Sequence, residues 1–184
     1  MRHNNYNITI SIMQKTQQQI ANFFFKNTSK AIPTVLDETN FNYVLKFDGC
    51  SKGNPGPSGA GAVLYYNNLE VWSEKQFVGN KETNNYAEYC GLLLGLKYAV
   101  NKNIRELKVC GDSQLVIKQM KGEYKLKSEN LYPLFNEAKK LEVTFDKIVY
   151  EHIYREFNGR ADELANSALD DQDFVNEIKS GFKN

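Results

Sequence analysis

The sequence has few cysteines, little excess charge and no long apolar run. Its three cysteines (Cys50, Cys90 and Cys110) are odd in number and show no Cys-x-x-Cys spacing, so neither a disulfide framework nor a cysteine zinc site is expected. The formal net charge is only +1. This excludes a protein that coats nucleic acid by its overall charge, and leaves local clusters to make any such contact. The most apolar run, residues 91–100, is short and contains Lys97, so it cannot span a bilayer.

The start of the chain differs from the rest in composition. Residues 1–40 are rich in Asn, Gln and Thr, and the first acidic residue is Asp37. No apolar segment typical of a secretion signal opens the chain, so we expect an intracellular protein without a membrane partner. We interpret residues 1–40 as a flexible tail, 41–172 as the folded domain and 173–184 as a C-terminal tail.

From residue 41 the pattern of apolar and turn residues becomes regular. Asn67-Asn68 is typical of a hairpin turn, and Gly91 and Gly95 would let a helix lie close against a sheet. The order of expected elements, βββαβααβα, predicts an α/β fold with a five-stranded mixed sheet and helices on both faces. The expected strands are 43–50, 60–66, 70–78, 107–111 and 148–153, with a turn at 51–58, and the expected helices are 84–101, 113–120, 129–141 and one from 159.

Four carboxylates stand at unusual positions of this pattern. Asp48 lies inside an apolar strand, Glu88 one turn into a helix, Asp112 directly after a buried strand, and Asp162 at the start of the last helix. Each has an ordinary explanation when taken alone. Asp112 can cap a helix and Asp162 can favour the positive end of a helix dipole. Glu88 can be a solvated helix residue, and Asp48 can have a local hydrogen-bond partner.

Taken together, the four carboxylates indicate a metal site. Asp48 and Asp112 both come near the carboxyl ends of strands, where open sheets place their sites. Clustered carboxylates repel one another, and hard cations such as Mg²⁺ or Mn²⁺ relieve that repulsion. Two such ions can activate a water molecule and stabilise the leaving oxygen of a phosphodiester. The pattern therefore favours metal-dependent phosphodiester hydrolysis.

Four segments resemble the signature blocks of type 1 ribonucleases H, in that family's order and spacing. They are FDGCSKGNPGPSGAG (47–61), TNNYAEYCGLLLGL (83–96), KVCGDSQLVI (108–117) and REFNGRADELAN (155–166). The resemblance covers about residues 41–172 and implies an RNase H-like fold. It also implies an endoribonuclease that hydrolyses the RNA strand of RNA–DNA hybrids with two Mg²⁺ or Mn²⁺ ions, leaving 5′-phosphate and 3′-hydroxyl ends. The catalytic metal ligands that it implies are Asp48, Glu88, Asp112 and Asp162.

The same resemblance implies a set of substrate contacts. Side-chain amides suit a hybrid, because they can both donate to and accept from the 2′-hydroxyls of its wide minor groove. Thr83 matches the family's DNA-phosphate contact. The residues that match the family's hybrid-contacting positions are Asn54, Asn84, Asn85 and Gln114. Without that context, Asn84 and Asn85 would be read as helix-start residues.

Two features of the loop before the last helix leave alternatives open. Some family members carry a mobile histidine that assists catalysis, and His152 lies at the matching distance, ten residues before Asp162. His152 also ends an expected strand and can be a structural residue. The Arg155-Glu156 pair resembles another branch, which uses a polar residue from this loop for catalysis or for substrate binding.

The region after the third strand–helix unit is short. Many bacterial members carry a long basic protrusion there, whereas this chain has Lys118, Lys121, Lys125 and Lys127. The sequence therefore resembles the compact branch of the family, and we expect a modest affinity for hybrids.

The tail contains Gln17-x-x-Ile20-x-x-Phe23-Phe24, which resembles the box by which replication proteins bind a sliding clamp (PCNA). One helical turn would place Ile20, Phe23 and Phe24 on one side as apolar anchors, with Gln17 beside them. Clamp binding would bring the protein to sites of DNA replication or repair in the nucleus or cytoplasm. Two other interpretations are packing of this segment on the folded domain and a mitochondrial presequence, although presequences are usually richer in Arg and Ser.

Two other functions compete with the hybrid-specific ribonuclease. A nuclease of the same fold can cut DNA of particular structure, but asparagines placed for 2′-hydroxyl contact argue against it. A decayed nuclease can serve as a non-catalytic clamp adaptor, but all four carboxylates are present. We expect the protein to be a monomer.

Overall fold

Residues 41–181 are described by the structure, which is a computed structural model. The four residues of the clamp-like box lie outside the described residues, so clamp binding stays a prediction; they are Gln17, Ile20, Phe23 and Phe24. None of the helices in the described part of the chain is both long and apolar enough to cross a membrane.

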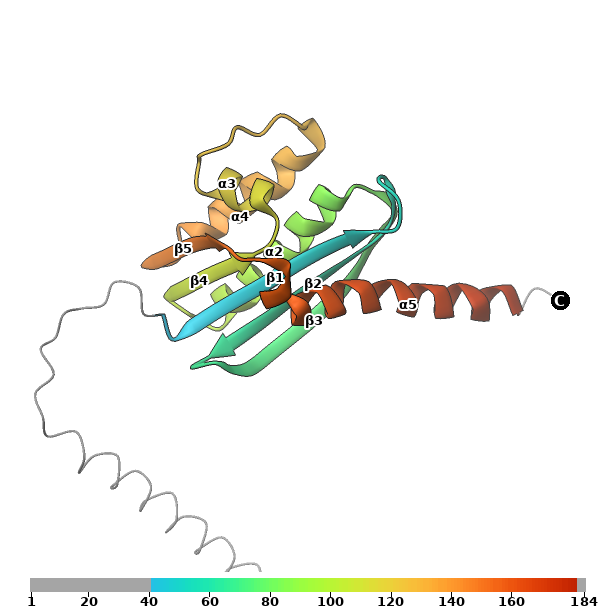
Figure 1. Ribbon diagram of the computed structural model, residues 1–184, viewed down its shortest axis with the longest axis horizontal. Coiled ribbons are helices and arrows are strands. Elements are labelled where there is room, and N and C mark those ends of the chain that lie inside the picture. Colours follow the sequence, from blue (N-terminus) through green and yellow to red (C-terminus); the bar gives the residue numbers. More distant parts are fainter. Residues whose placement is uncertain (1–40, 182–184) are drawn as a thin grey trace, which may run out of the picture. The chain divides into compact units, whose positions relative to one another are not determined.

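Five strands form one mixed sheet in the order β3-β2-β1-β4-β5 (Figure 1). The first three strands are antiparallel neighbours, whereas β4 runs parallel to β1 and β5 runs parallel to β4. This arrangement confirms the expected five-stranded mixed sheet. The strands are β1 (Tyr43–Ser51), β2 (Gly56–Tyr66), β3 (Leu69–Glu82), β4 (Glu106–Gly111) and β5 (Lys147–His152).

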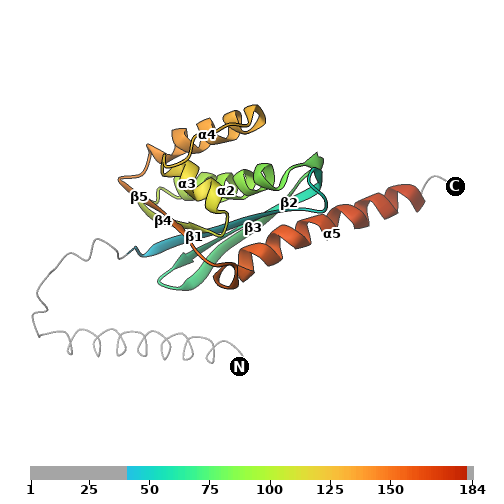
Figure 2. The same cartoon turned by 45° about the horizontal axis from the view of Figure 1, so that its top comes forward.

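Helices cover both faces of the sheet, as expected. Helices α2, α3 and α4 lie on one face and α5 lies on the other (Figure 2). Helix α5 continues past residue 172, where we had placed the end of the domain. The helices are α2 (Asn84–Asn101), α3 (Gln114–Met120), α4 (Tyr132–Glu142) and α5 (Gly159–Gly181), with short 3-10 helices η1 (Glu129–Leu131) and η2 (Arg155–Phe157).

Tight packing of α2 on β1 sets the distance between Glu88 on the helix and Asp48 on the strand. A Cβ atom on Gly91 would lie 2.4 Å from the Asp48 backbone oxygen, and one on Gly95 would lie 2.2 Å from Leu45 Cδ1. Glycine at these positions therefore allows the helix to approach the strand, as predicted. The main hydrophobic core lies beneath α2 and includes Leu45 and Phe47, both fully buried.

The hairpin between β2 and β3 also follows the prediction. Asn67 and Asn68 both have positive φ angles, of 48° and 64°, which two-residue hairpin turns require.

The boundaries of two elements differ from the expectation. Strand β2 begins at Gly56, inside the expected turn, because Gly56 pairs with Glu82 at the far end of a longer β3. The helix expected from residue 129 is a 3-10 helix over its first three residues, and α4 begins at Tyr132, with Pro133 in its first turn. Proline has no N–H to donate and is favoured at a helix start, so it sets this boundary.

Candidate active site

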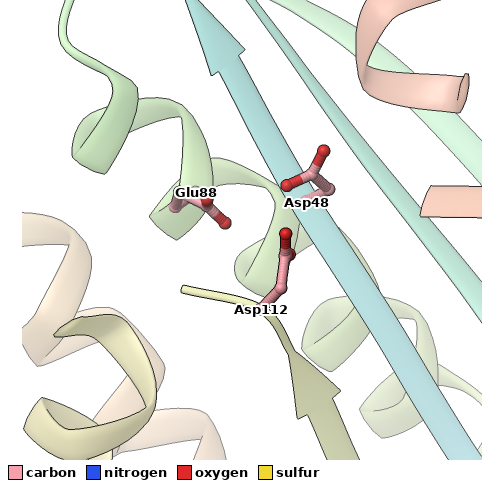
Figure 3. Close-up of side chains that lie close together, drawn as sticks. All are labelled: Asp48, Glu88 and Asp112. Carbon is pink, nitrogen blue, oxygen red and sulfur yellow. The ribbon is translucent and has the colours of Figure 1, made fainter. Parts of the chain in front are cut away.

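Three of the four predicted carboxylates meet at the end of the sheet. Asp48 comes from β1, Glu88 from α2, and Asp112 directly follows β4 (Figure 3). One side-chain oxygen from each lies within 4.8 Å of the other two. Strands β1 and β4 are parallel neighbours, with Phe47 opposite Gly111, so Asp48, which continues β1, and Asp112, which follows the last residue of β4, lie side by side. The tight contact of α2 with β1 then brings Glu88 to them.

The ordinary explanations of two of these residues do not hold. Glu88 is not a solvated helix residue, because only 5% of it is exposed. Asp112 is not the cap of α3, because Ser113 is: its hydroxyl accepts a hydrogen bond from the Val116 backbone N–H at 3.4 Å. Both carboxylates therefore occupy their positions for another reason.

Burial and mutual repulsion disfavour negative charge in the cluster. Asp48 is 5% exposed, and burial, followed by repulsion from Asp112 and Asp162, raises its pKa to about 7. Burial, followed by repulsion from Asp48 and Asp112, raises the pKa of Glu88 well above its ordinary value. The Gly49 backbone N–H and the Arg155 guanidinium oppose both shifts. A cation bound among these oxygens would reverse the effect.

The fourth predicted carboxylate, Asp162, lies in the first turn of α5 and is engaged by an arginine. Its Oδ1 is 2.5 Å from Nη2 of Arg155. Asp162 is outside the group of three oxygens described above, but its charge acts on Asp48. Glu156 is exposed, next to Arg155 in η2.

Two side chains hold Asp112 and its backbone. His152 Nε2 lies 3.1 Å from the Asp112 backbone oxygen, so the predicted assisting histidine is exposed beside the cluster and anchored at the end of β5. Asn158 was not singled out from the sequence. Its Nδ2 donates to Asp112 Oδ1 at 2.7 Å and to the Phe47 backbone oxygen at 2.8 Å. Its place just before the last helix would suggest an ordinary helix cap, although it lies within the segment 155–166 that resembles a signature block of the family.

The predicted substrate contacts gather at the starts of α2 and α3. Thr83 caps α2, because its hydroxyl accepts from the Tyr86 backbone N–H at 3.3 Å. Asn54 Oδ1 accepts from the Asn84 backbone N–H at 3.1 Å, which links the β1–β2 turn to this helix start. Asn84 also lies near the carboxylates, with its Nδ2 3.5 Å from Glu88 Oε1. Asn85 is the next residue of α2, and Gln114 is exposed at the first position of α3.

The residues present fit a hard divalent cation. All the side-chain atoms that could bind the ion are carboxylate oxygens, which such ions prefer as ligands. Glu88 Oε2 is buried and has no hydrogen-bond partner among the described protein residues, which is costly for a carboxylate unless a cation or donor faces it. The pKa values of Asp48 and Glu88 are raised first by burial and then by mutual repulsion, and a bound cation would offset both effects.

A mixed five-stranded sheet with helices on both faces makes this an α/β protein, and comparisons with known proteins identify the fold as RNase H-like. Residues 46–168 match the family described as reverse transcriptase-like. The bifunctional protein Rv2228c of Mycobacterium tuberculosis is 43% identical over 129 residues, which are 69% of this chain and 35% of the relative. The chain thus spans about a third of the length of that mycobacterial protein.

Two solved structures are similar to this chain over nearly the full length of their solved chains. RNase H1 from the halophilic archaeon Halobacterium salinarum NRC-1 has a TM-score of 0.67 and 38% identity, with 70% of this chain and 98% of that chain covered. LC11-RNase H1, solved in complex with RNA/DNA hybrid, has a TM-score of 0.66 and 32% identity, with 71% and 98% covered. The chain belongs to the ribonuclease H-like family.

Proposed function

We propose that the protein is an endoribonuclease that hydrolyses the RNA strand of RNA–DNA hybrids, leaving 5′-phosphate and 3′-hydroxyl ends. The observation that carries the proposal is the convergence of Asp48, Glu88 and Asp112, whose side-chain oxygens lie within 4.8 Å of one another. Family membership gives this cluster a chemical context, because a relative of 32% identity was solved in complex with RNA/DNA hybrid.

Asp48, Glu88 and Asp112 would hold the metal, with Asp162 completing the set, and we propose two Mg²⁺ or Mn²⁺ ions. When bound, such ions supply a nucleophilic water at neutral pH and neutralise charge on the leaving oxygen. The protein itself contributes rigid placement of the ligands. Asp48 is fixed within β1, Glu88 within α2, and Asp112 by its bond from Asn158.

The polar residues around the cluster would orient the hybrid. Asn54 accepts a hydrogen bond from the Asn84 backbone N–H and Thr83 accepts one from the Tyr86 backbone N–H, so both side chains are tied to the start of the helix that carries Glu88. Asn85 and Gln114 stand at the starts of the two helices that flank the cluster. Amide groups at these positions suit 2′-hydroxyls, which duplex DNA lacks. His152 and the Arg155-Glu156 pair are proposed as assisting residues next to Asp112 and Asp162.

A cleavage assay tests the proposal and separates it from its alternatives. Labelled RNA–DNA hybrid, duplex DNA and duplex RNA are each incubated with Mg²⁺, Mn²⁺ or EDTA. We expect cleavage of the RNA strand of the hybrid alone, only with metal, with 5′-phosphate products. Cutting of duplex DNA would favour a structure-specific DNA nuclease, and no cutting of any substrate would favour a non-catalytic adaptor. Products with 2′,3′-cyclic phosphate would overturn the mechanism, because the 2′-hydroxyl would then be the nucleophile.

We also propose that the tail delivers the nuclease to a sliding clamp at sites of DNA replication or repair. The support is the spacing of Gln17, Ile20, Phe23 and Phe24 in the sequence.

A further inference from the structure

Asn158 occupies an unusual position between the elements of the carboxylate cluster. It is fully buried, directly before α5. Its Nδ2 donates to the side chain of Asp112 at 2.7 Å and to the backbone oxygen of Phe47, the residue before Asp48, at 2.8 Å. Its own backbone oxygen accepts from the Asp162 N–H at 3.1 Å. Asn158 thus bonds to the Asp112 side chain, to the backbone next to Asp48 and to the backbone of Asp162.

The side chain of Asn158 does not act as an ordinary helix cap. In a cap, the side-chain oxygen accepts a hydrogen bond from a backbone N–H in the first turn of the helix. Here Oδ1 is buried without a hydrogen-bond partner among the described residues, and the amide nitrogen makes both contacts. Leaving a buried oxygen unpaired is unfavourable. The amide of Asn158 therefore acts as a hydrogen-bond donor through its nitrogen, while its oxygen accepts no bond from the described residues.

The direction of the amide is fixed by chemistry. Both of its close neighbours, Asp112 Oδ1 and the Phe47 backbone oxygen, can only accept while Asp112 is ionised. The reverse orientation would press an oxygen against two oxygens at 2.7 and 2.8 Å. The donated bond consequently sets the rotation of the Asp112 carboxylate, and with it the direction of both of its oxygens. The donor to that carboxylate is thus a fully buried side chain.

We propose that Asn158 is the positioning residue of the metal site: it orients the Asp112 carboxylate as a ligand and locks β1, the segment after β4, and α5 around the cluster. The inference rests on the proposed metal-dependent function. It predicts that Asn158 acts on metal affinity through Asp112, beyond any effect on folding. Partners that orient metal ligands in this way typically contribute about 10- to 100-fold to metal affinity.

The test is metal binding by the full chain without substrate, in wild type, Asn158→Ala and Leu164→Ala. Mn²⁺ is titrated and the free ion is read by its electron paramagnetic resonance signal, and thermal unfolding of each variant is measured in EDTA. Leu164→Ala is the matched control: Leu164 is also buried in the first turns of α5, and it packs in an apolar cluster with Val63 and Ala161. It should lower stability without changing Mn²⁺ affinity.

We expect Asn158→Ala to lose at least about tenfold in Mn²⁺ affinity at a temperature where it remains folded. Affinity within twofold of wild type, or an equal loss in Leu164→Ala, would overturn the inference. If Asn158→Ala does not fold, Asn158→Thr is used, because it has similar volume and one hydroxyl donor for two acceptors. It should lose part of the affinity, and wild-type affinity in a folded Thr variant would count against the inference equally. Failure of the wild-type chain to bind Mn²⁺ would instead refute the proposed metal site.

Discussion

Arg155 and Asp162 form an ion pair beside the carboxylate cluster, with 2.5 Å between Arg155 Nη2 and Asp162 Oδ1. The arginine side chain is 75% exposed, whereas that of Asp162 is 29% exposed. The guanidinium also favours the ionised forms of Asp48 and Glu88. Arg155 thus supplies positive charge to the same group of carboxylates that a metal would neutralise, and the two cations should compete for Asp162.

The first prediction is that Arg155→Gln raises the Mn²⁺ affinity of the substrate-free protein and lowers its stability in EDTA. Exposed ion pairs contribute about 0.2–1 kcal/mol, so the affinity gain should be at most about fivefold. Arg160→Gln is the control. Arg160 lies in the first turn of α5, as Asp162 does, but it pairs with Glu70 and Glu163. Metal titration and thermal unfolding measure the two effects. Weaker Mn²⁺ binding in Arg155→Gln would show that the arginine supports the metal site.

The sequence predicted the order of elements along the chain and a meeting of four carboxylates, three of which lie together in the structure, because both predictions follow from local patterns. Asp48 and Asp112 could be placed together since each stands at the carboxyl end of an apolar strand, and parallel neighbours bring such ends to one edge. Gly91 and Gly95 marked the face of α2 that approaches β1. These signals depend on strand period and helix phase alone, so they are readable without knowledge of the fold.

Asn158 could not be predicted, because its role depends on partners far away in sequence. Phe47 lies 111 residues before it and Asp112 lies 46 residues before it. A helix-start asparagine is common for local reasons, and although Asn158 lies in the signature-like segment 155–166, that segment does not reveal which distant residues it contacts. The engagement of Asp162 by Arg155 was equally hidden, since a charged pair seven residues apart in a loop and a helix start follows no regular period.

The second prediction concerns the pH dependence of stability without metal. Asp48 has a pKa of about 7 in the folded protein, above its ordinary value of 3.8, so the folded state binds more protons than the unfolded state between these values. Stability should therefore fall as pH rises through that window. Asp48→Asn removes the charge with little change of shape and should be more stable than wild type above pH 7 in EDTA. A tenfold change in a protonation equilibrium corresponds to about 1.4 kcal/mol. The same variant should lose hybrid cleavage.

Glu70→Gln serves as the control for this experiment. Hydrogen bonding by Arg160 holds the pKa of Glu70 below its ordinary value, so this carboxylate adds stability that is lost as pH falls. Its removal should give the opposite sign of effect at neutral pH. Chemical unfolding in EDTA at several pH values measures both variants. Equal stability of Asp48→Asn and wild type above pH 7 would contradict the account of charge repulsion, and near-normal turnover would remove Asp48 from the catalytic site.

The third prediction addresses the tail, which lies outside the described residues. Phe23 and Phe24 belong to the clamp-like box, whereas Phe25 follows it. Large apolar anchors contribute about 1.5–3 kcal/mol each when fully buried, but ordering a free segment offsets part of this. A dissociation constant on the order of micromolar is expected for the host's sliding clamp.

Changing Phe23 and Phe24 together to Ala should abolish binding in calorimetry, and Phe25→Ala should retain it. Cleavage of short hybrids should be unchanged in both. Identical titrations for wild type and the double variant would discard the clamp proposal, and reduced thermal stability of the double variant would favour packing on the folded domain.

The last prediction tests whether close packing of α2 on β1 is what brings Glu88 to Asp48. A Cβ atom at position 91 would lie 2.4 Å from the Asp48 backbone oxygen and 3.0 Å from that of Gly61. Backbone atoms cannot yield as a flexible side chain can, so Gly91→Ala must push the helix from the sheet. Overpacking of this kind costs about 1–3 kcal/mol, and Glu88, less than one turn away on the same helix, would move with it.

Gly159→Ala is the matched control for that change. A Cβ atom at position 159 meets nothing within 4 Å, and the residue lies at the first position of α5, close in sequence to Asp162. It should leave stability unchanged or raise it by up to about 1 kcal/mol, since alanine restricts the unfolded chain. Thermal unfolding and Mn²⁺ titration are measured for both variants. Gly91→Ala should lose stability and metal affinity together, because the same contact that seats the helix also sets the distance between its carboxylate and that of β1. A folded Gly91→Ala protein with wild-type Mn²⁺ affinity would show that the position of Glu88 does not depend on this contact.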